Sequence, residues 1–116
     1  MDYIGNAFSL GMVESYLLEA IRIRPVRHGF NPVTLLQAKK PAVSVVGHED
    51  IARILGVPFN RQSVKLLPGD ELFVAQYYGE RLPEGCTTLP PNAVIKWVSV
   101  KIRKVRWSEQ DAQLSS

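Results

Sequence analysis

The sequence predicts an α/β fold in which one compact domain contains a mixed β-sheet flanked by short helices. Segments that alternate apolar and polar residues, as half-buried strands do, take turns with segments whose apolar residues recur at helical spacing. Of the 116 residues, 46% are hydrophobic, which suffices for one buried core. No repeat or low-complexity stretch divides the chain. We therefore expect a single domain over residues 1–107 and a flexible C-terminal tail over 108–116, where SEQDAQLSS has little to bury.

The N-terminal segment predicts a strand, a polar loop and a helix. Residues 1–4 form a short apolar start that we interpret as the first strand. Asn6 and Ser9 are residue types that favour turns and helix caps. They precede the sequence LGMVESYLLEA at residues 10–20, which we interpret as a helix.

The middle of the chain predicts a strand, a helix, a second strand and a second helix. AIRIRPV at 20–26 alternates isoleucine with arginine, the period of a half-exposed strand, and its proline favours an edge position. NPVTLLQAKK at 31–40 places a capping asparagine and a first-turn proline at the start of a short helix. AVSVV at 42–46 is apolar almost throughout, which predicts a central strand. EDIARILG at 49–56 predicts a compact helix with acids in its first turn and a terminating glycine.

The C-terminal half predicts two further strands joined by an irregular loop. A Pro-Gly-Asp turn at residues 68–70 precedes a run of β-forming residues at 72–78. The segment at 80–92 contains three prolines, a glycine and two threonines, which predicts an ordered surface loop. Residues 93–107 alternate apolar and polar side chains over a long stretch, which predicts the last strand.

The composition limits the classes of function. Fourteen Lys and Arg residues against eleven Asp and Glu residues give a net charge of +3, which favours a polyanionic ligand such as a nucleotide or a nucleic acid. The chain has neither a signal-peptide pattern nor the ~20-residue apolar stretch of a membrane span, so we expect a cytoplasmic protein with no membrane partner. Cys86 is the only cysteine, which excludes an intrachain disulfide and a cysteine-based zinc cluster. We expect no cofactor and no redox chemistry.

His48 is the first candidate for chemistry because it lies where the strand at 42–46 meets the helix at 49–56. In an open α/β sheet, ligands bind at the carboxyl ends of the strands, and Gly47 would let a ligand approach the backbone closely. A histidine in this place can instead cap the helix or hydrogen-bond to a neighbouring carbonyl. The other histidine, His28, lies in VRHGF, and we expect it to be a solvated loop residue.

Other charged residues have simpler structural explanations. Glu49 and Asp50 suggest metal ligands beside His48, but adjacent residues in a first helical turn point in different directions. We expect these two acids to support the helix start electrostatically, and we expect no metal site. Arg81 and Glu84 lie three apart in a proline-containing loop and would project together in a helical turn. On spacing alone, a surface ion pair of little energetic consequence is the favoured interpretation.

A basic stripe follows the last predicted strand. Alternating Lys and Arg residues there suit a phosphate backbone, but on an exposed strand face they also serve solubility, which is the favoured interpretation. The stripe consists of Lys96, Lys101, Arg103, Lys104 and Arg106.

Four stretches taken together resemble the viral anti-CRISPR ring nuclease family. They are YIGNAFSLGMV, VVGHEDIARILGV, KLLPGDELFVAQY and ERLPEGCTTLP, and the resemblance covers nearly the whole chain, from Tyr3 to about Val105. The family, long described as a domain of unknown function, has members in archaeal viruses, phages, plasmids and bacteria. The resemblance implies a small α/β homodimer that binds cyclic tetra-adenylate, the second messenger of type III CRISPR defence, and cleaves it without a metal.

The resemblance also implies roles for individual residues. The family's catalytic histidine, catalytic glutamate and loop arginine fall on His48, Glu84 and Arg81. The candidate ligand-binding residues are Asn6, Ser9, Gly47 and Lys65.

These residues fit the chemistry of RNA cleavage. The ribose 2′-hydroxyl attacks the neighbouring phosphorus, and the departing 5′-oxygen needs a proton in the transition state. A histidine that titrates near neutrality can supply it, which predicts His48 as general acid. Arg81 would neutralise charge on the phosphoryl oxygens, and Glu84 would orient the histidine or the 2′-hydroxyl, or accept its proton. The expected products are linear adenylates with 2′,3′-cyclic phosphate ends.

The symmetry of such a ligand favours a two-fold homodimer, because a ring of four identical nucleotides has two-fold axes and a dimer presents paired sites to opposite phosphates. Other functions stay open. A non-catalytic protein of the same fold would sequester the cyclic nucleotide without cutting it. A small nucleic-acid-binding regulator would use the basic stripe and bind long strands with steep salt dependence, whereas the ring nuclease interpretation expects no long nucleic acid partner. A structural or interaction protein is a further alternative.

Overall fold

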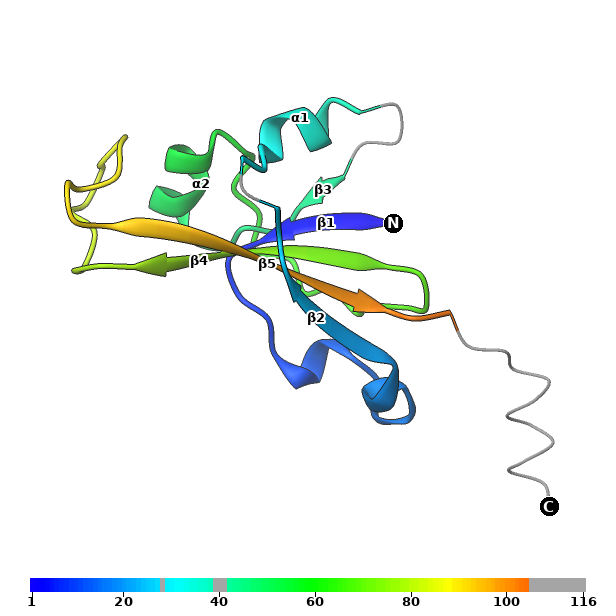
Figure 1. Ribbon diagram of the computed structural model, residues 1–116. Helices are drawn as coiled ribbons and strands as arrows, with labels where there is room; N and C mark the ends of the chain where they lie inside the picture. Colours follow the sequence, from blue (N-terminus) through cyan, green and yellow to red (C-terminus); the bar gives the residue numbers. More distant parts are fainter. Residues whose placement is uncertain (28, 39–41, 105–116) are drawn as a thin grey trace, which may run out of the picture.

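A mixed five-stranded sheet runs through the computed structural model, which describes residues 1–27, 29–38 and 42–104 (Figure 1). The strands are β1 (Asp2–Gly5), β2 (Ile21–Pro25), β3 (Val43–Ser44), β4 (Glu71–Tyr78) and β5 (Val94–Ile102). They lie in the order β2-β5-β4-β1-β3. β1 pairs in parallel with both β3 and β4, whereas β5 pairs antiparallel with β4 and with β2. The predicted mixed sheet is therefore confirmed.

Two short α-helices, α1 (Pro32–Leu36) and α2 (Glu49–Leu55), begin where the sequence predicts. The Asn31 side chain accepts a hydrogen bond from the Val33 amide at 2.9 Å, so it caps α1 as expected. α2 ends at Gly56, whose φ of 73° is the left-handed conformation that glycine adopts without strain. The polar cap and the terminating glycine thus set the helix boundaries.

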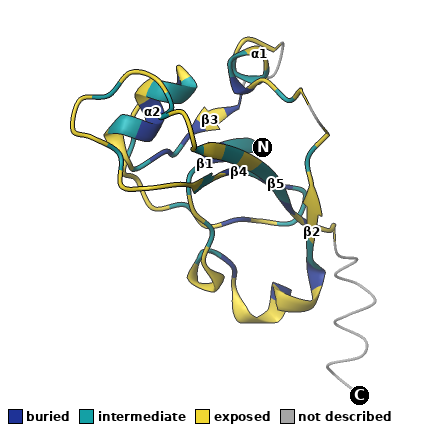
Figure 2. Ribbon diagram, turned by 60° about the vertical axis from the view of Figure 1, so that its left-hand side comes forward, coloured by how far each residue is buried: buried dark blue, intermediate teal, exposed yellow. Residues whose placement is uncertain are grey.

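The two faces of the sheet are covered differently. α1 and α2 pack on one face, as Figure 1 shows. They enclose a core cluster of Ile4, Ala42, Val46, Ile51, Ala52 and Val57. The other face is partly covered by two 3₁₀ helices, η1 (Leu10–Met12) and η2 (Ser15–Ala20), whose outer side is mostly exposed (Figure 2). They enclose a second cluster of Val13, Leu17, Ala20, Leu66, Leu72, Val74, Val100 and Ile102.

The prediction of one helix over residues 10–20 is wrong. This segment forms two separate 3₁₀ helices, η1 and η2, with an extended residue between them. Val13 has φ −126° and ψ 132° and forms a parallel bridge with Leu66. The Leu66 amide donates to the Met12 carbonyl at 2.8 Å, and Val13 and Leu66 are both buried. The β-branched Val13 is thus drawn into strand-like pairing, which interrupts the helix.

The strand predicted at 42–46 is not central, because only two of its residues pair in the sheet and β3 is an edge strand. Its apolar character has another cause. Residues 57–61 run along its free edge, where Ser44 Oγ donates to the Pro58 carbonyl at 2.5 Å and Asn60 Nδ2 donates to the Ser44 carbonyl at 3.0 Å. A loop therefore covers this edge and buries the segment, as a neighbouring strand would.

The other predicted elements are present in the described residues. β1, β2, β4 and β5 confirm the remaining strands, and β2 lies at an edge as its proline indicated. The turn at 68–70 is closed by the Asp70 amide, which donates to the Leu67 carbonyl at 2.9 Å. Residues 79–93 connect β4 to β5 without a helix or a strand, as predicted. Four predicted features lie outside the described residues: His28, the helix end at 39–40, the strand end at 105–107 and the tail at 108–116.

The carboxyl ends of the neighbouring strands β1, β3 and β4 lie side by side, because these three strands run parallel. They form one edge of the sheet across its strand ends, as distinct from its edge strands β2 and β3. Asn6 follows β1, Gly47 and His48 follow β3, and the loop at 79–93 follows β4. Ligands of α/β sheets bind at this kind of edge. The topology therefore gathers candidate residues from three distant parts of the sequence.

Replacing Leu66 tests the described core. Leu66 is fully buried, so Leu66→Ala should lower the free energy of unfolding by about 2–5 kcal/mol through lost burial and a residual cavity. The adjacent Leu67 is 55% exposed. Leu67→Ala should change the same free energy by less than about 0.5 kcal/mol. Urea denaturation followed by circular dichroism measures both, and equal effects would contradict this core.

Candidate functional site

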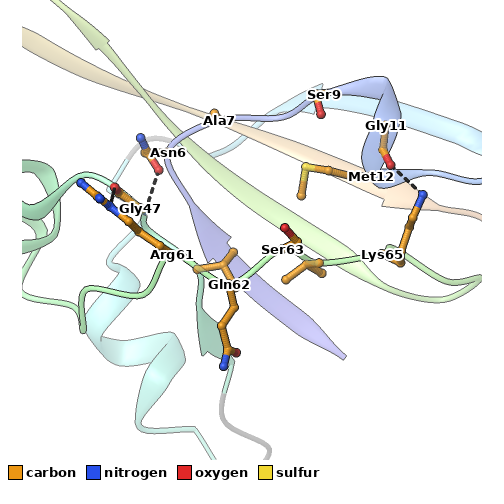
Figure 3. Close-up of a pocket in the computed structure, with 12 residues that line it drawn as sticks. Asn6, Ala7, Ser9, Gly11, Met12, Gly47, Arg61, Gln62, Ser63 and Lys65 are labelled. Atoms are coloured by element: carbon orange, nitrogen blue, oxygen red, sulfur yellow. Dashed lines mark hydrogen bonds between the residues drawn. The ribbon is translucent and has the colours of Figure 1, made fainter.

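Asn6 connects the end of β1 to the segment that follows β3. Its Oδ1 accepts a hydrogen bond from the Gly47 amide at 3.0 Å (Figure 3). The expected helix-capping role is therefore wrong for Asn6. Ser9 does occupy the cap position of η1, but its side chain makes no capping hydrogen bond. Asn6 instead fixes the backbone directly before His48.

A cavity of about 710 Å³ opens beside this junction, between the N-terminal loop and residues 61–65 (Figure 3). Three of the residues predicted to bind ligand, Asn6, Ser9 and Gly47, line it, and so does the fourth, Lys65. Lys65 Nζ donates to the Gly11 carbonyl at 2.8 Å and lies 3.6 Å from Glu14 Oε1. The remaining lining residues are Ala7, Gly11, Met12, Val45, Arg61, Gln62, Ser63 and Val64.

The space over Gly47 is occupied by Arg61, a residue that the sequence interpretation missed. Arg61 Nε donates to the Gly47 carbonyl at 3.3 Å, and its guanidinium lies 5.3 Å from the centre of the Phe59 ring. A Cβ at Gly47 would lie 3.6 Å from Arg61 Cγ, an ordinary contact distance. The only sequence signal for Arg61 was a single cation in the polar stretch PFNRQS.

Arg61 has charge available for an anion. Within the described ranges, no carboxylate lies at salt-bridge distance from its guanidinium. Its contact with the Gly47 carbonyl uses Nε, which leaves the terminal nitrogens of the side chain for a ligand. Arg61 therefore suits a phosphate or another anionic group.

His48 caps α2 with its imidazole ring. Its Nδ1 accepts a hydrogen bond from the Ile51 amide at 3.2 Å, and the residue is exposed. Because Nδ1 is the acceptor, the neutral ring in this position carries its proton on Nε2. The predicted capping alternative for His48 is therefore correct, and Nε2 is the nitrogen left for a ligand.

A second cavity, of about 400 Å³, brings His48 and Glu84 together from opposite halves of the sequence. Glu84 is exposed in the loop after β4. Arg81 is also exposed but does not line this cavity, and the turn that would have aligned it with Glu84 is not helical. The remaining lining residues are Gly47, Glu49, Asp50, Arg53, Arg61 and Gly85.

The two cavities share Gly47 and Arg61. A ligand too large for either cavity can therefore extend from the Ser9 and Lys65 side to His48 and Glu84 along one continuous surface. This surface combines hydrogen-bonding groups, a lysine, two arginines, an imidazole and three carboxylates. Such a set can hold an anionic ligand and move a proton.

The basic stripe does not form one continuous face. Lys96 and Lys101 stand an odd number of residues apart on β5 and therefore project from opposite faces of the sheet. Lys96 Nζ lies 5.4 Å from the centre of the Tyr78 ring, and Arg106 lies outside the described residues. The favoured role in solubility is consistent with this division.

In residues 1–27, 29–38 and 42–104, no three or more histidine, cysteine or carboxylate side chains are grouped so as to hold a metal ion. No helix in that part of the chain has the length and apolar character needed to cross a bilayer.

Comparison with known proteins identifies one family and one fold. A family model described as STIV B116-like matches residues 2–107 of the chain. Among solved structures, B116 of Sulfolobus turreted icosahedral virus (STIV) is similar, with a TM-score of 0.67 and 19% sequence identity. The match covers 86% of this chain and 97% of B116, and at this identity it shows a shared fold. No curated protein matches the chain significantly.

Proposed function

The chain belongs to the STIV B116-like family, and we propose that it is a metal-independent nuclease that opens a ring-shaped oligonucleotide. The substrate is cyclic tetra-adenylate, in line with the resemblance to anti-CRISPR ring nucleases in the sequence. The products are linear adenylates with a 2′,3′-cyclic phosphate at one end and a 5′-hydroxyl at the other. Removal of this messenger would switch off type III CRISPR signalling.

One observation carries the proposal: His48 and Glu84 line one cavity, and that cavity shares Gly47 and Arg61 with the cavity beside Asn6 and Lys65. A proton donor and a carboxylate beside an extended, hydrogen-bonding surface suit a phosphodiester within a larger ligand. The connection runs along Gly47 and Arg61, so a phosphate bound there would lie next to the imidazole.

His48 acts as the general acid in this mechanism. The 2′-hydroxyl forms the new bond to phosphorus, the bond from phosphorus to the 5′-oxygen breaks, and Nε2 of His48 gives that oxygen a proton. A ring that donates in this way must carry protons on both nitrogens, so Nδ1 has to release the Ile51 amide that it accepts in the resting structure. The helix cap and the acid form of His48 are therefore mutually exclusive states.

Glu84 and Arg61 have complementary roles. Glu84 receives or orients the proton of the 2′-hydroxyl, because it is the carboxylate that the loop after β4 contributes to the cavity. Arg61 stabilises the charge that develops on the phosphoryl oxygens, the role that the sequence assigned to Arg81. A role for Arg81 stays a prediction, since ligand binding would have to bring it toward the phosphate.

A two-fold homodimer completes the proposed enzyme. The face of the sheet opposite α1 and α2 exposes Ile23, Tyr78 and Val94, which are 60%, 49% and 48% exposed. The strand register places all three on this face, since Tyr78 is opposite Val94 and Ile23 is opposite Val100. A cavity of about 310 Å³ opens there, lined by Asn6, Ala7, Phe8, Ile23, Val74, Gln76, Val98 and Val100. A second copy would cover this apolar surface and supply a second site for the opposite phosphate of the ring.

Two substitutions of His48 separate its capping role from its chemical role. Asparagine is a good cap residue, so His48→Asn should keep the stability of α2, whereas His48→Ala should lower it by about 0.5–2 kcal/mol. Both variants should cut the ring about 10²- to 10⁴-fold more slowly than wild type, because neither has a proton donor of suitable strength. Single-turnover cleavage in EDTA, ring affinity and thermal midpoint are measured on the same preparations.

The paired variants also define how the proposal fails. Ring affinity should change little, since proton donation acts in the transition state. A His48→Asn protein that cuts within about threefold of wild type would show that His48 is not the acid.

The dimer has its own test. Val94→Lys replaces an exposed apolar residue of this face by a second cation beside Lys96 and should convert a dimer into a monomer. Leu67→Lys alters a similarly exposed residue at the distant 67–70 turn and should leave the dimer intact. Multi-angle light scattering at micromolar concentration gives the mass of each. A monomeric wild type, with or without the ring, would exclude the dimer, and a dimeric Val94→Lys would exclude this face.

A further inference from the structure

Glu84 lies in a tight turn that is closed by backbone contacts. The Cys86 amide donates to the Pro83 carbonyl at 3.2 Å, and Gly85 has φ 77°. A positive φ at the third of four residues is the pattern of a type II turn, which glycine adopts without strain. Glu84 is the second residue of this turn, so its direction depends on how the turn is held.

Side chains of α2 bind the backbone of the two residues that follow Glu84, Gly85 and Cys86. Asp50 Oδ1 accepts a hydrogen bond from the Gly85 amide at 3.3 Å. Arg53 Nη1 donates to the Cys86 carbonyl at 3.2 Å and to Asp50 Oδ1 at 2.8 Å. Asp50 and Arg53 are three residues apart, so they share one side of the helix.

Glu84 has little else to fix its place. Within the described residues, its side chain makes no hydrogen bond or ion pair, and the residue is exposed. The Asp50 side chain, in contrast, is only 18% exposed and accepts hydrogen bonds from both Gly85 and Arg53. The position of the Glu84 carboxylate is therefore set through the backbone of its turn.

We propose that Asp50 and Arg53 form a latch that positions Glu84 beside His48. The same short helix then carries His48 at its cap, and Asp50 in its first turn and Arg53 in its last turn hold the turn of Glu84. Asp50 and Arg53 are positioning residues, since their contacts with the loop are with its backbone atoms. The effect on catalysis rests on the proposed nuclease function, whereas the latch itself does not.

Hydrogen exchange of the Gly85 amide tests the latch directly, by NMR on the full-length protein. Asp50→Ala removes the acceptor and should speed exchange several-fold, and Asp50→Asn, which keeps an oxygen at that place, should give an intermediate rate. Glu49→Gln is the matched control. It removes a carboxylate from the same helical turn. The Glu49 carboxylate lies 3.6 Å from Arg53 Nη2 but makes no bond to the loop, so exchange of the Gly85 amide should stay at the wild-type rate.

Cleavage kinetics then test whether the latch positions Glu84 for catalysis. Asp50→Ala should slow single-turnover cleavage of cyclic tetra-adenylate by about 10- to 100-fold, the penalty of a small misplacement of a catalytic group, and Asp50→Asn should restore part of the rate. Ring affinity should stay within about threefold of wild type. In a Glu84→Gln background the same Asp50→Ala change should alter the rate by less than about twofold, because Asp50 acts through Glu84.

The outcomes separate the latch from the nuclease. Unchanged Gly85 exchange in Asp50→Ala would overturn the latch, whatever the activity. An Asp50→Ala effect of full size in the Glu84→Gln background would overturn positioning through Glu84. If wild type does not cut the ring at all, the nuclease proposal fails, and accelerated Gly85 exchange in Asp50→Ala would still support the latch.

Discussion

The parallel pairing of β1 with both β3 and β4 is the constraint on which the site depends. Tyr3 lies opposite Val43 on one side and Leu72 on the other, so three strands from distant parts of the sequence end at the same edge. An antiparallel partner in either place would send its following loop to the opposite edge. The segments that carry Asn6, His48 and Glu84 meet because of this one choice of direction.

Short polar contacts then determine the geometry within that edge. Asn6 accepts from Gly47, His48 accepts from Ile51, and Asp50 accepts from Gly85. In each case a side chain satisfies a backbone amide that the sheet and helices leave unpaired. The groups suited to chemistry, the imidazole Nε2 and the Glu84 carboxylate, stay accessible while the backbone around them is held.

The sequence predicted the elements whose signals are local. The Asn31 cap, the Gly56 terminator and the alternation in β5 each depend on neighbouring residues, and each is confirmed. It failed where partners distant in sequence decide, because Val13 leaves the helix to pair with Leu66, and the apolar segment of β3 is covered by a loop. The residues of the candidate site divide in the same way, into those that the sequence indicated and one that only the folded structure shows. His48 and Glu84 came from motif resemblance, whereas Arg61 reaches the site only through a contact with Gly47 that no local pattern shows.

The proposed nuclease opens an RNA ring with its own side chains and without a metal. The most direct measurement is phosphorus-31 NMR of cyclic tetra-adenylate incubated with stoichiometric protein in EDTA. We predict that the ring signal is replaced by that of a linear product with a 2′,3′-cyclic phosphate. A ring that stays intact after prolonged incubation, even when tightly bound, would contradict catalysis and identify a sequestering protein, and cleavage that EDTA abolishes and a divalent metal restores would contradict the metal-independent mechanism.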